Sequence, residues 1–439
     1  MKGKIFFGFI LITNLLLAQS RKIEFTEFDL ENGLHVILHQ DNSTPIVAIS
    51  VVYHVGSKNE DPERTGFAHF FEHLMFEGSE YIGRGEFDKI MENAGATNNA
   101  STSQDITHYY EVLPSNQLEL GLWIESERLL HAKIDSVGVE TQRKVVKEEK
   151  KQRYENQPYG TILEETFKRA FKVHPYTWLP IGSAQYIDEA RIDEFREFYN
   201  TFYVPNNATL VITGDIDLDE TQELVKKYFN DIPKGKREIP RPTIVEPPLI
   251  AEVRDTVYDN IQLPLVLHAY RIPAIGTKDF YSLEMLTTLL SSGESSRLQK
   301  SVVDKKQMAV NVGAFPFSLE HDGLFLIYGI SNTGISADEL EISIQEELDR
   351  VIKYKITETE FQKLRNQIEN DFVSSNSTME GISESLANYH VLYGRTDLIN
   401  SELDSYMNVT IKDIQDVAKK YLKSNNRVVL HYLQKSEQN

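Results

Sequence analysis

The residues best suited to chemistry are His69, Glu72 and His73, in the segment GFAHFFEHLMFEGS. Apolar residues recur through this segment at helical spacing, so we expect a helix. Side chains four residues apart share one helix face, and His69 and His73 could therefore bind a tetrahedral zinc as two neighbouring ligands. Glu72 adjoins His73, where its carboxylate could take a proton from a water on the metal. The pattern H-x-x-E-H predicts a zinc hydrolase, and the alternative is a pair of buried histidines held by ordinary hydrogen bonds.

A zinc hydrolase needs a third protein ligand, and the best candidate is Glu149 in the segment VETQRKVVKEEKKQRYENQPYG. We expect a helix here from about Glu140 to Tyr154, with Val145 and Val146 marking its inner face. At 100° per residue, Glu149 falls between the directions of the two valines, whereas Glu148 points away. The alternative is that Glu149 is one more solvated acid on a charged helix.

The elements that position these residues belong to a globular protein. The chain has 439 residues, of which 41% are hydrophobic and 26% are charged, which excludes a multi-span membrane protein. Its formal charge of −20 argues against nucleic acid as a partner. The chain contains no cysteine, so thiolate sites and disulfides are excluded and any metal must sit on histidine and carboxylate.

Residues 1–20 have the pattern of a secretory signal peptide. Lys2 and Lys4 precede an apolar run, and Ala18 and Ser20 supply the small residues of a cleavage site after Ser20. We therefore expect an exported protein, most simply periplasmic, with no stable membrane span after cleavage. An uncleaved membrane anchor is the alternative.

The rest of the chain divides into two related parts. A proline-rich stretch at residues 236–250 predicts an extended linker between an N-terminal domain, residues 21–235, and a C-terminal domain, residues 251–439. In both domains a helical pattern leads through an Asn-Asn turn into a β-branched strand. The turns start at Asn206 and Asn425, which are 219 residues apart, as expected of a duplicated domain.

Each half mixes alternating strands with long amphipathic helices, so we predict an α+β fold. The expected strands of the first half include Leu34–Leu38, Ile46–Val52 and Thr209–Thr213.

Over nearly its whole mature length the chain resembles the insulinase/pitrilysin metallopeptidases, which include the mitochondrial processing peptidases. The matching stretches include GSKNEDPERTGFAHFFEHLMFEGS, GATNNASTSQDITHYYEVLP, QRKVVKEEKKQRYENQPYG and HPYTWLPIGS. The resemblance implies two sandwich-like halves that form a clamshell around a substrate chamber. It also implies one zinc per chain, held by His69, His73 and Glu149, because the family's third ligand follows the second histidine at this distance. In the family an edge strand pairs with extended substrate, which assigns Asn99 and Ala100 to substrate binding.

Two departures from the family pattern matter. Gln142 stands where relatives often have a glutamate that supports the active site from the second shell. In the second half, the zinc-motif positions are taken by Glu284, Thr287 and Thr288, which cannot form this zinc site. Related proteases also use an arginine and a tyrosine of that half near the metal, and our alignment puts Val303 and Val310 at those positions.

These features predict an exported zinc metalloendopeptidase that cleaves peptides or unfolded segments, with Glu72 as general base. The missing arginine and tyrosine suggest that it is the catalytic subunit of a two-chain assembly, in which a related chain supplies them; a homodimer is the other possible assembly. The alternatives are a catalytically silent family member and a peptide-binding protein with a structural metal. Zinc is the expected metal, although manganese or cobalt could occupy such a site in vitro.

Overall fold

The computed structural model describes residues 22–435, so the predicted signal peptide lies outside the described residues. Within 22–435, no helix is both long enough and apolar enough to cross a membrane.

The first half is built on a six-stranded sheet in the order β1-β2-β6-β3-β5-β4. All neighbours are antiparallel except β2 and β6. The sheet forms where apolar and β-branched residues gather, and its three central strands are almost fully buried. Its strands are β1 Thr26–Asp29, β2 His35–Gln40, β3 Ile46–Tyr53, β4 Thr97–Thr102, β5 Thr107–Pro114 and β6 Ala208–Gly214.

The helices of the first half carry the candidate zinc motif. They are α1 Phe67–Leu74, α2 Phe87–Asn93, α3 Leu118–His131, α4 Ser136–Lys150, α5 Ile162–Ala170, α6 Ala184–Glu189, α7 Ile192–Phe202 and α8 Leu218–Phe229. Helix α4 continues in wider turns over Lys151–Glu155.

The second half is built on a five-stranded sheet in the order β7-β11-β8-β10-β9. Its strands are β7 Val253–Asp259, β8 Leu265–Ile272, β9 Ala309–Phe317, β10 Gly323–Ser331 and β11 Arg427–Gln434. Its helices are α9 Lys278–Ser291, α10 Ala337–Lys353, α11 Glu358–Ser375, α12 Met379–Tyr393, α13 Glu402–Met407 and α14 Ile411–Tyr421. The predicted α+β class with two related halves is confirmed, whereas the predicted domain boundaries stay a prediction.

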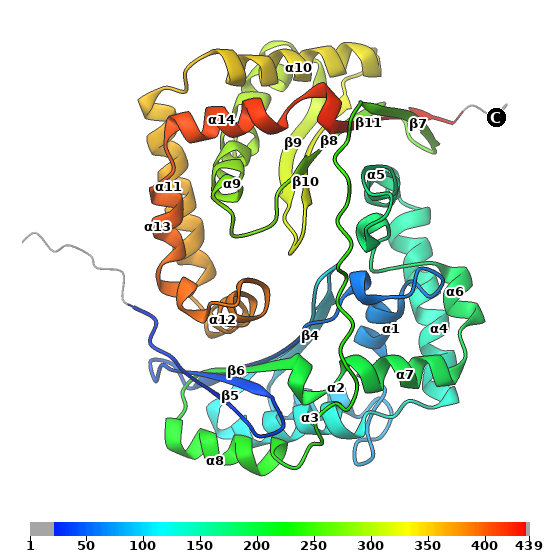
Figure 1. The fold of residues 1–439 in the computed structure, drawn as a ribbon, viewed down its shortest axis with the longest axis vertical. Helices are drawn as coiled ribbons and strands as arrows, with labels where there is room; N and C mark the ends of the chain where they lie inside the picture. Colours follow the sequence, from blue (N-terminus) through cyan, green and yellow to red (C-terminus); the bar gives the residue numbers. More distant parts are fainter. Residues whose placement is uncertain (1–21, 436–439) are drawn as a thin grey trace, which may run out of the picture.

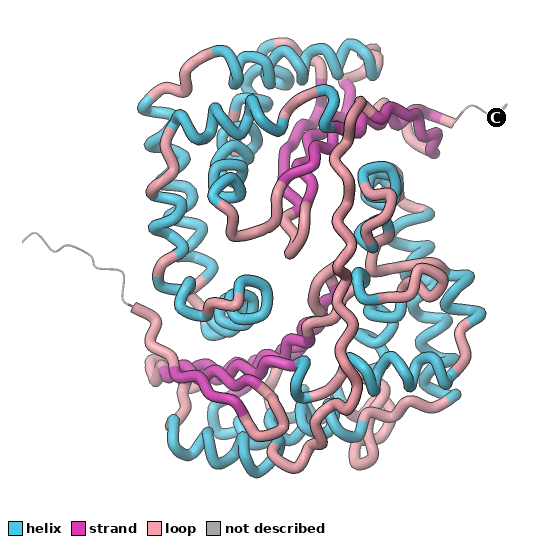
Figure 2. Tube along the Cα trace, viewed as in Figure 1, coloured by secondary structure: helices cyan, strands magenta, loops and turns pink. Residues whose placement is uncertain are grey.

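The two halves exchange helices (Figures 1 and 2). Helix α12 of the second half packs on β3 and β6 of the first sheet, and α5 of the first half packs on β8 and β11 of the second. Leu386 and Ala387 of α12 share one apolar cluster with Ala48, Val52 and Val211 of the first sheet. Each half therefore completes its neighbour's core.

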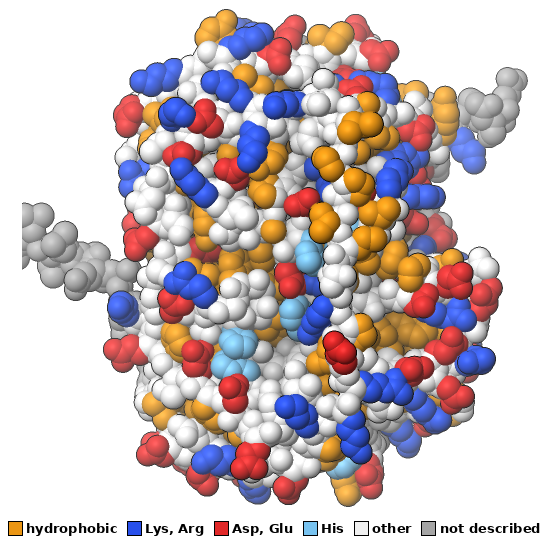
Figure 3. Space-filling view, in the orientation of Figure 1, with side chains coloured by type: hydrophobic (Ala, Val, Ile, Leu, Met, Phe, Trp, Pro, Cys, Tyr) orange, Lys and Arg blue, Asp and Glu red, His pale blue; other side chains and the backbone are white. Residues whose placement is uncertain are grey.

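The proline-rich linker runs along both halves (Figure 1). It has no regular secondary structure, but polar contacts fix it in place. Arg241 donates to the carbonyl of His54, and the Glu246 carboxylate accepts the backbone N–H groups of Lys172, Val173 and His174. Some of its apolar side chains stay exposed, and apolar side chains gather beside the linker path in Figure 3.

Helix α4 differs from the sequence-based expectation in one respect. Val146 is 2% exposed, but Val145 is 43% exposed and does not belong to the inner face. The buried stripe instead runs through Val139 and Val146, which are seven residues apart, and Glu149 follows it at the next helical step. The inner face of α4 is therefore not centred between Val145 and Val146, as predicted from the sequence. Glu149 points inward, as predicted.

Candidate metal centre

Helix α1 is oriented by its aromatic face. Phe67, Phe70, Phe71 and Leu74 are almost fully buried, and Phe67 stacks on Phe195 of α7 with ring centroids 4.6 Å apart. This face anchors the helix to the core, so that the opposite face carries His69, Glu72 and His73 toward a cavity.

The start of α1 is fixed by a buried carboxylate. Glu60 accepts hydrogen bonds from the backbone N–H groups of Gly66 and Ala68 at 2.9 and 2.8 Å. N–H groups at the start of a helix have no partner within the helix, so the Glu60 carboxylate takes that place. Burial raises the pKa of Glu60 to about 8, although these hydrogen bonds oppose the shift. Gly66 has φ +102°, a conformation that favours glycine.

Three donor atoms converge beside α1. The Nε2 atoms of His69 and His73 lie 3.3 Å apart, and Oε2 of Glu149 lies 3.5 and 3.1 Å from them, respectively. Ligands of a tetrahedral zinc with bonds of about 2.0–2.1 Å are separated by about 3.3 Å, so the three distances suit this metal. Oε2 is buried and accepts no hydrogen bond. A cation at the centre would satisfy it, and the residues therefore fit a zinc site.

The electrostatics agree with this donor set. Burial and the neighbouring His73 lower the pKa of His69 to about 4, which leaves its imidazole neutral near pH 7, as a metal ligand must be. The His73 imidazole also lowers the pKa of Glu149. Arg153 binds the other carboxylate oxygen of Glu149 at 2.9 Å, so that Oε2 alone is turned toward the histidines. Arg153 is a site residue that was not predicted, although its i,i+4 spacing from Glu149 is a usable signal.

Glu72 lies in the same cavity as the three donors. Burial raises its pKa, and the Thr102 hydroxyl of β4 and the His73 imidazole act in the opposite direction. A carboxylate with a raised pKa beside a metal site is a suitable proton acceptor in hydrolysis.

The cavity has a volume of about 730 Å³ and lies between the halves. The first half contributes the α1 and α4 residues and the edge strand β4, including Asn99 and Ala100. The second half contributes Phe317–Leu319 and the α12 side chains Asn388 and Leu392. Strand β4 pairs with β5 on one side and is the last strand of its sheet, so its outer edge borders the cavity. The contribution of the second half could not be read from the sequence.

Gln142, which was expected to support the active site, lies on α4 but does not line the cavity. Its amide donates to Glu77 at 2.7 Å, and Glu77 pairs with Arg84. Its role is therefore to join α4 to the segment that follows α1.

The corresponding positions of the second half hold no such donor set. On α9, Thr287 and Thr288 bond to the backbone of their own helix, and Glu284 accepts from Ser318. Val303 packs against the second core, and Val310 is half exposed. Neither Arg297, which pairs with Glu360, nor Tyr328 lines the cavity.

Comparisons with known proteins agree with this architecture. Residues 35–177 match the family described as Insulinase (Peptidase family M16), and residues 190–368 match the Peptidase M16 inactive domain. The zinc protease PqqE of Helicobacter pylori is 32% identical over 412 residues, covering 92% of each chain. A beta subunit of the mitochondrial-processing peptidase from Lentinula edodes is 25% identical over 91% of this chain and 88% of that protein.

The fold matches solved structures as well. The crystal structure of a protease from Helicobacter pylori superposes with a TM-score of 0.90 at 29% identity, over 94% of this chain and 100% of that one. The match extends over both halves, including the one without the zinc motif. The chain belongs to the insulinase family of peptidases, family M16.

Proposed function

We propose that this chain is a catalytically competent zinc endopeptidase that cleaves extended peptides or unfolded protein segments. The observation that supports it best is the convergence of His69, His73 and Glu149 next to Glu72 in one cavity. A structural zinc normally has four protein ligands, and within residues 22–435 the metal-ligand group at this site has three.

The residues would share the work of peptide hydrolysis. A zinc held by the three donors would act as a Lewis acid on the peptide carbonyl and on the attacking water. Glu72 would accept the proton of that water and pass it to the leaving amine. The edge of β4, with Asn99 and Ala100, would hold the substrate backbone by strand addition.

Replacement of the base tests this proposal. Glu72→Gln should retain the zinc content of the parent protein and lose about 10²–10⁴-fold in peptide cleavage, since the amide cannot accept the proton. Glu148→Gln is the matched control, because Glu148 is exposed beside a ligand and should leave cleavage unchanged. A silent or purely peptide-binding protein would show no hydrolysis for Glu72→Gln to remove.

We further propose that the chain is the catalytic subunit of a two-subunit peptidase. Among the described residues, the second half contributes no arginine or tyrosine to the cavity wall. Two measurements compare cleavage of an unfolded peptide by the purified chain alone and with a related chain that lacks the zinc motif. The partner should raise the rate; full activity of the solitary chain would contradict the two-chain assembly and leave a monomer or homodimer.

Export to the periplasm is proposed from residues 1–20 alone. The mature protein should begin at Arg21, which mass spectrometry of the chain recovered from cells can establish. A chain that retains residues 1–20 would contradict removal of the leader.

A further inference from the structure

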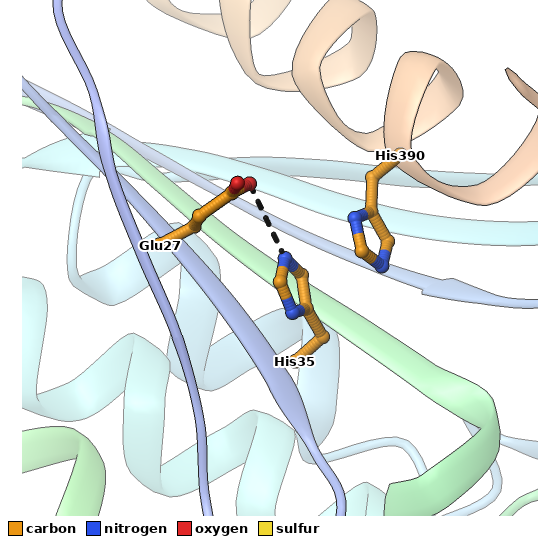
Figure 4. A group of neighbouring side chains, drawn as sticks. All are labelled: Glu27, His35 and His390. Atoms are coloured by element: carbon orange, nitrogen blue, oxygen red, sulfur yellow. Dashed lines mark ion pairs between the residues drawn. The ribbon is translucent and has the colours of Figure 1, made fainter. Parts of the chain in front are cut away.

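A second group of potential metal ligands lies away from the catalytic cavity. Glu27 of β1, His35 of β2 and His390 of α12 each place one ligand atom within 4.8 Å of the others. Figure 4 shows Glu27 and His35 on neighbouring strands, with His390 descending from the helix above them. The group therefore joins the first sheet to a helix of the second half.

Strand register places two carboxylates beside His35. Asp29 lies directly opposite His35 in the β1–β2 pair, and Glu27 is two residues before it, on the same face of the sheet. Asp29 Oδ1 lies 2.8 Å from Nδ1 of His35, and Glu27 Oε2 lies 3.5 Å from Nε2. The bond to Asp29 holds the proton on Nδ1, so Nε2 presents a lone pair, as in carboxylate–histidine–metal triads.

Apart from the contact with Glu27, Nε2 of His35 has no polar partner among the described residues. This atom is buried and makes no hydrogen bond. The imidazole rings of His35 and His390 are parallel within 7°, with centroids 3.6 Å apart. Nδ1 of His390 is the ring nitrogen nearer to Glu27 in Figure 4, and its contact with the Thr396 hydroxyl is long, at 3.4 Å.

We propose that Glu27, His35 and His390 form a second site for a divalent transition-metal ion such as zinc, which ties α12 to the first sheet. Two imidazoles and a carboxylate favour zinc, copper or nickel over magnesium or calcium. Binding requires both rings to turn out of their stack and the donors to approach one another. Histidine χ2 angles are broad, and the Glu27 side chain is 43% exposed, so both movements are available.

A comparable group, Asp338, Glu341 and His431, is not a candidate metal site. Glu341 accepts two hydrogen bonds from Arg254, at 2.7 and 2.6 Å, and pairs with His431 at 2.7 Å. Its carboxylate is already neutralised by an arginine, so this group is an ion-pair network.

The position of His390 gives the site a consequence for the catalytic cavity. Asn388 and Leu392 of the same helix line that cavity, and His390, between them, points the other way. A metal ion on His390 would therefore hold α12 in the position where it closes the cavity.

Zinc stoichiometry tests the proposal. Metal-free protein is titrated with Zn²⁺ in competition with a chromophoric chelator at neutral pH. The parent should bind two equivalents, His390→Gln one, and the control His431→Gln two. Equal stoichiometry of the parent and His390→Gln would overturn the site. If the catalytic centre binds no zinc, the parent should bind one equivalent, His390→Gln none and His431→Gln one. Failure of the catalytic site is thus distinguishable from failure of the second site.

Two less disruptive variants test the same site in case His390→Gln does not fold. Glu27→Gln changes an exposed side chain and should weaken the second equivalent at least tenfold. Asp29→Asn should weaken binding of the second zinc about 10- to 100-fold, because the proton of His35 is then no longer fixed on Nδ1. The second equivalent should also slow amide hydrogen exchange in α12 of the parent and not of His390→Gln. Unchanged affinity in both carboxylate variants, or unchanged exchange in α12, would contradict the proposal.

Discussion

At the scale of single residues, a buried lysine joins the two halves. Lys58 of the first half is 2% exposed and pairs with Asp105 at 2.8 Å and with Glu320. Glu320 belongs to the turn between β9 and β10 and also bonds to His54 at 2.8 Å. A charge buried this deeply requires both partners, so this contact resists separation of the halves.

The contact makes stability depend on pH. Burial alone would raise the pKa of Glu320, but the His54 hydrogen bond and the Lys58 charge outweigh it and lower the pKa to about 2. A depressed carboxylate pKa contributes stability above its unfolded value, about 4.5, and loses it as pH falls toward 2. Glu320→Gln should therefore lower the free energy of unfolding by about 2 kcal/mol at pH 7, and by about half of that near pH 3, where part of the contribution is already lost.

Denaturant unfolding at the two pH values measures this difference. Glu294→Gln is the control, because Glu294 is exposed. A Glu320→Gln deficit that is the same at pH 3 and pH 7 would contradict the assigned ion pair.

Residue patterns predicted much of the candidate site. His69, Glu72 and His73 follow from local helical spacing, and Glu149 from the inner face of its helix. Val145 misled the placement of that face, because one apolar residue on a charged helix can stay in solvent. His35 and His390 gave no signal, since their proximity arises only when α12 crosses to the other half.

At the scale of elements, one loop holds both helices that carry the donors. Gly182 has φ +59°, and a Cβ there would lie 2.2 Å from the backbone nitrogen of Gly66 at the start of α1. The carbonyl of Gly182 also accepts a hydrogen bond from Lys150, the neighbour of Glu149, at 2.5 Å. The relative positions of α1 and α4 therefore depend on this close approach.

Gly182→Ala should displace α1 from α4. We expect weaker zinc binding and a loss of several kcal/mol in the free energy of unfolding, because the contacting atoms are backbone and cannot move aside. Gly85→Ala is the matched control: its φ is +67° and a Cβ there meets nothing within 4 Å, so it should cost about 1 kcal/mol. Zinc competition and denaturant unfolding measure both effects, and equal losses in the two variants would contradict the role of the loop.

At the scale of the molecule, the cavity lies between halves that contact each other directly. A peptide substrate therefore needs an entry path between them. We expect α12 to move away from the first sheet when substrate enters. Ser50 of β3 and Ser383 of α12 meet in the buried interface, with their Oγ atoms 2.9 Å apart. Because the chain contains no cysteine, a cysteine pair at these positions would have only each other as partner.

The double variant Ser50→Cys/Ser383→Cys tests this movement. The oxidised protein should lose at least tenfold in peptide cleavage, because about 2 Å of sulfur–sulfur separation fixes the helix on the sheet. Reduction should restore the rate. Each single variant controls for the loss of the serine hydroxyl, and full activity of the oxidised pair would show that substrate enters without movement of α12.

The exchange of helices between the halves also bears on the order in which the chain matures. The apolar side chains of β3 and β6 that meet α12 are made early, since β6 ends at Gly214, whereas α12 begins only at Met379. A chain that emerges N-terminus first into the compartment where it folds leaves one face of this sheet uncovered until most of the second half has followed. The first half is thus an incomplete folding unit, and its native packing awaits the C-terminal part of the same polypeptide.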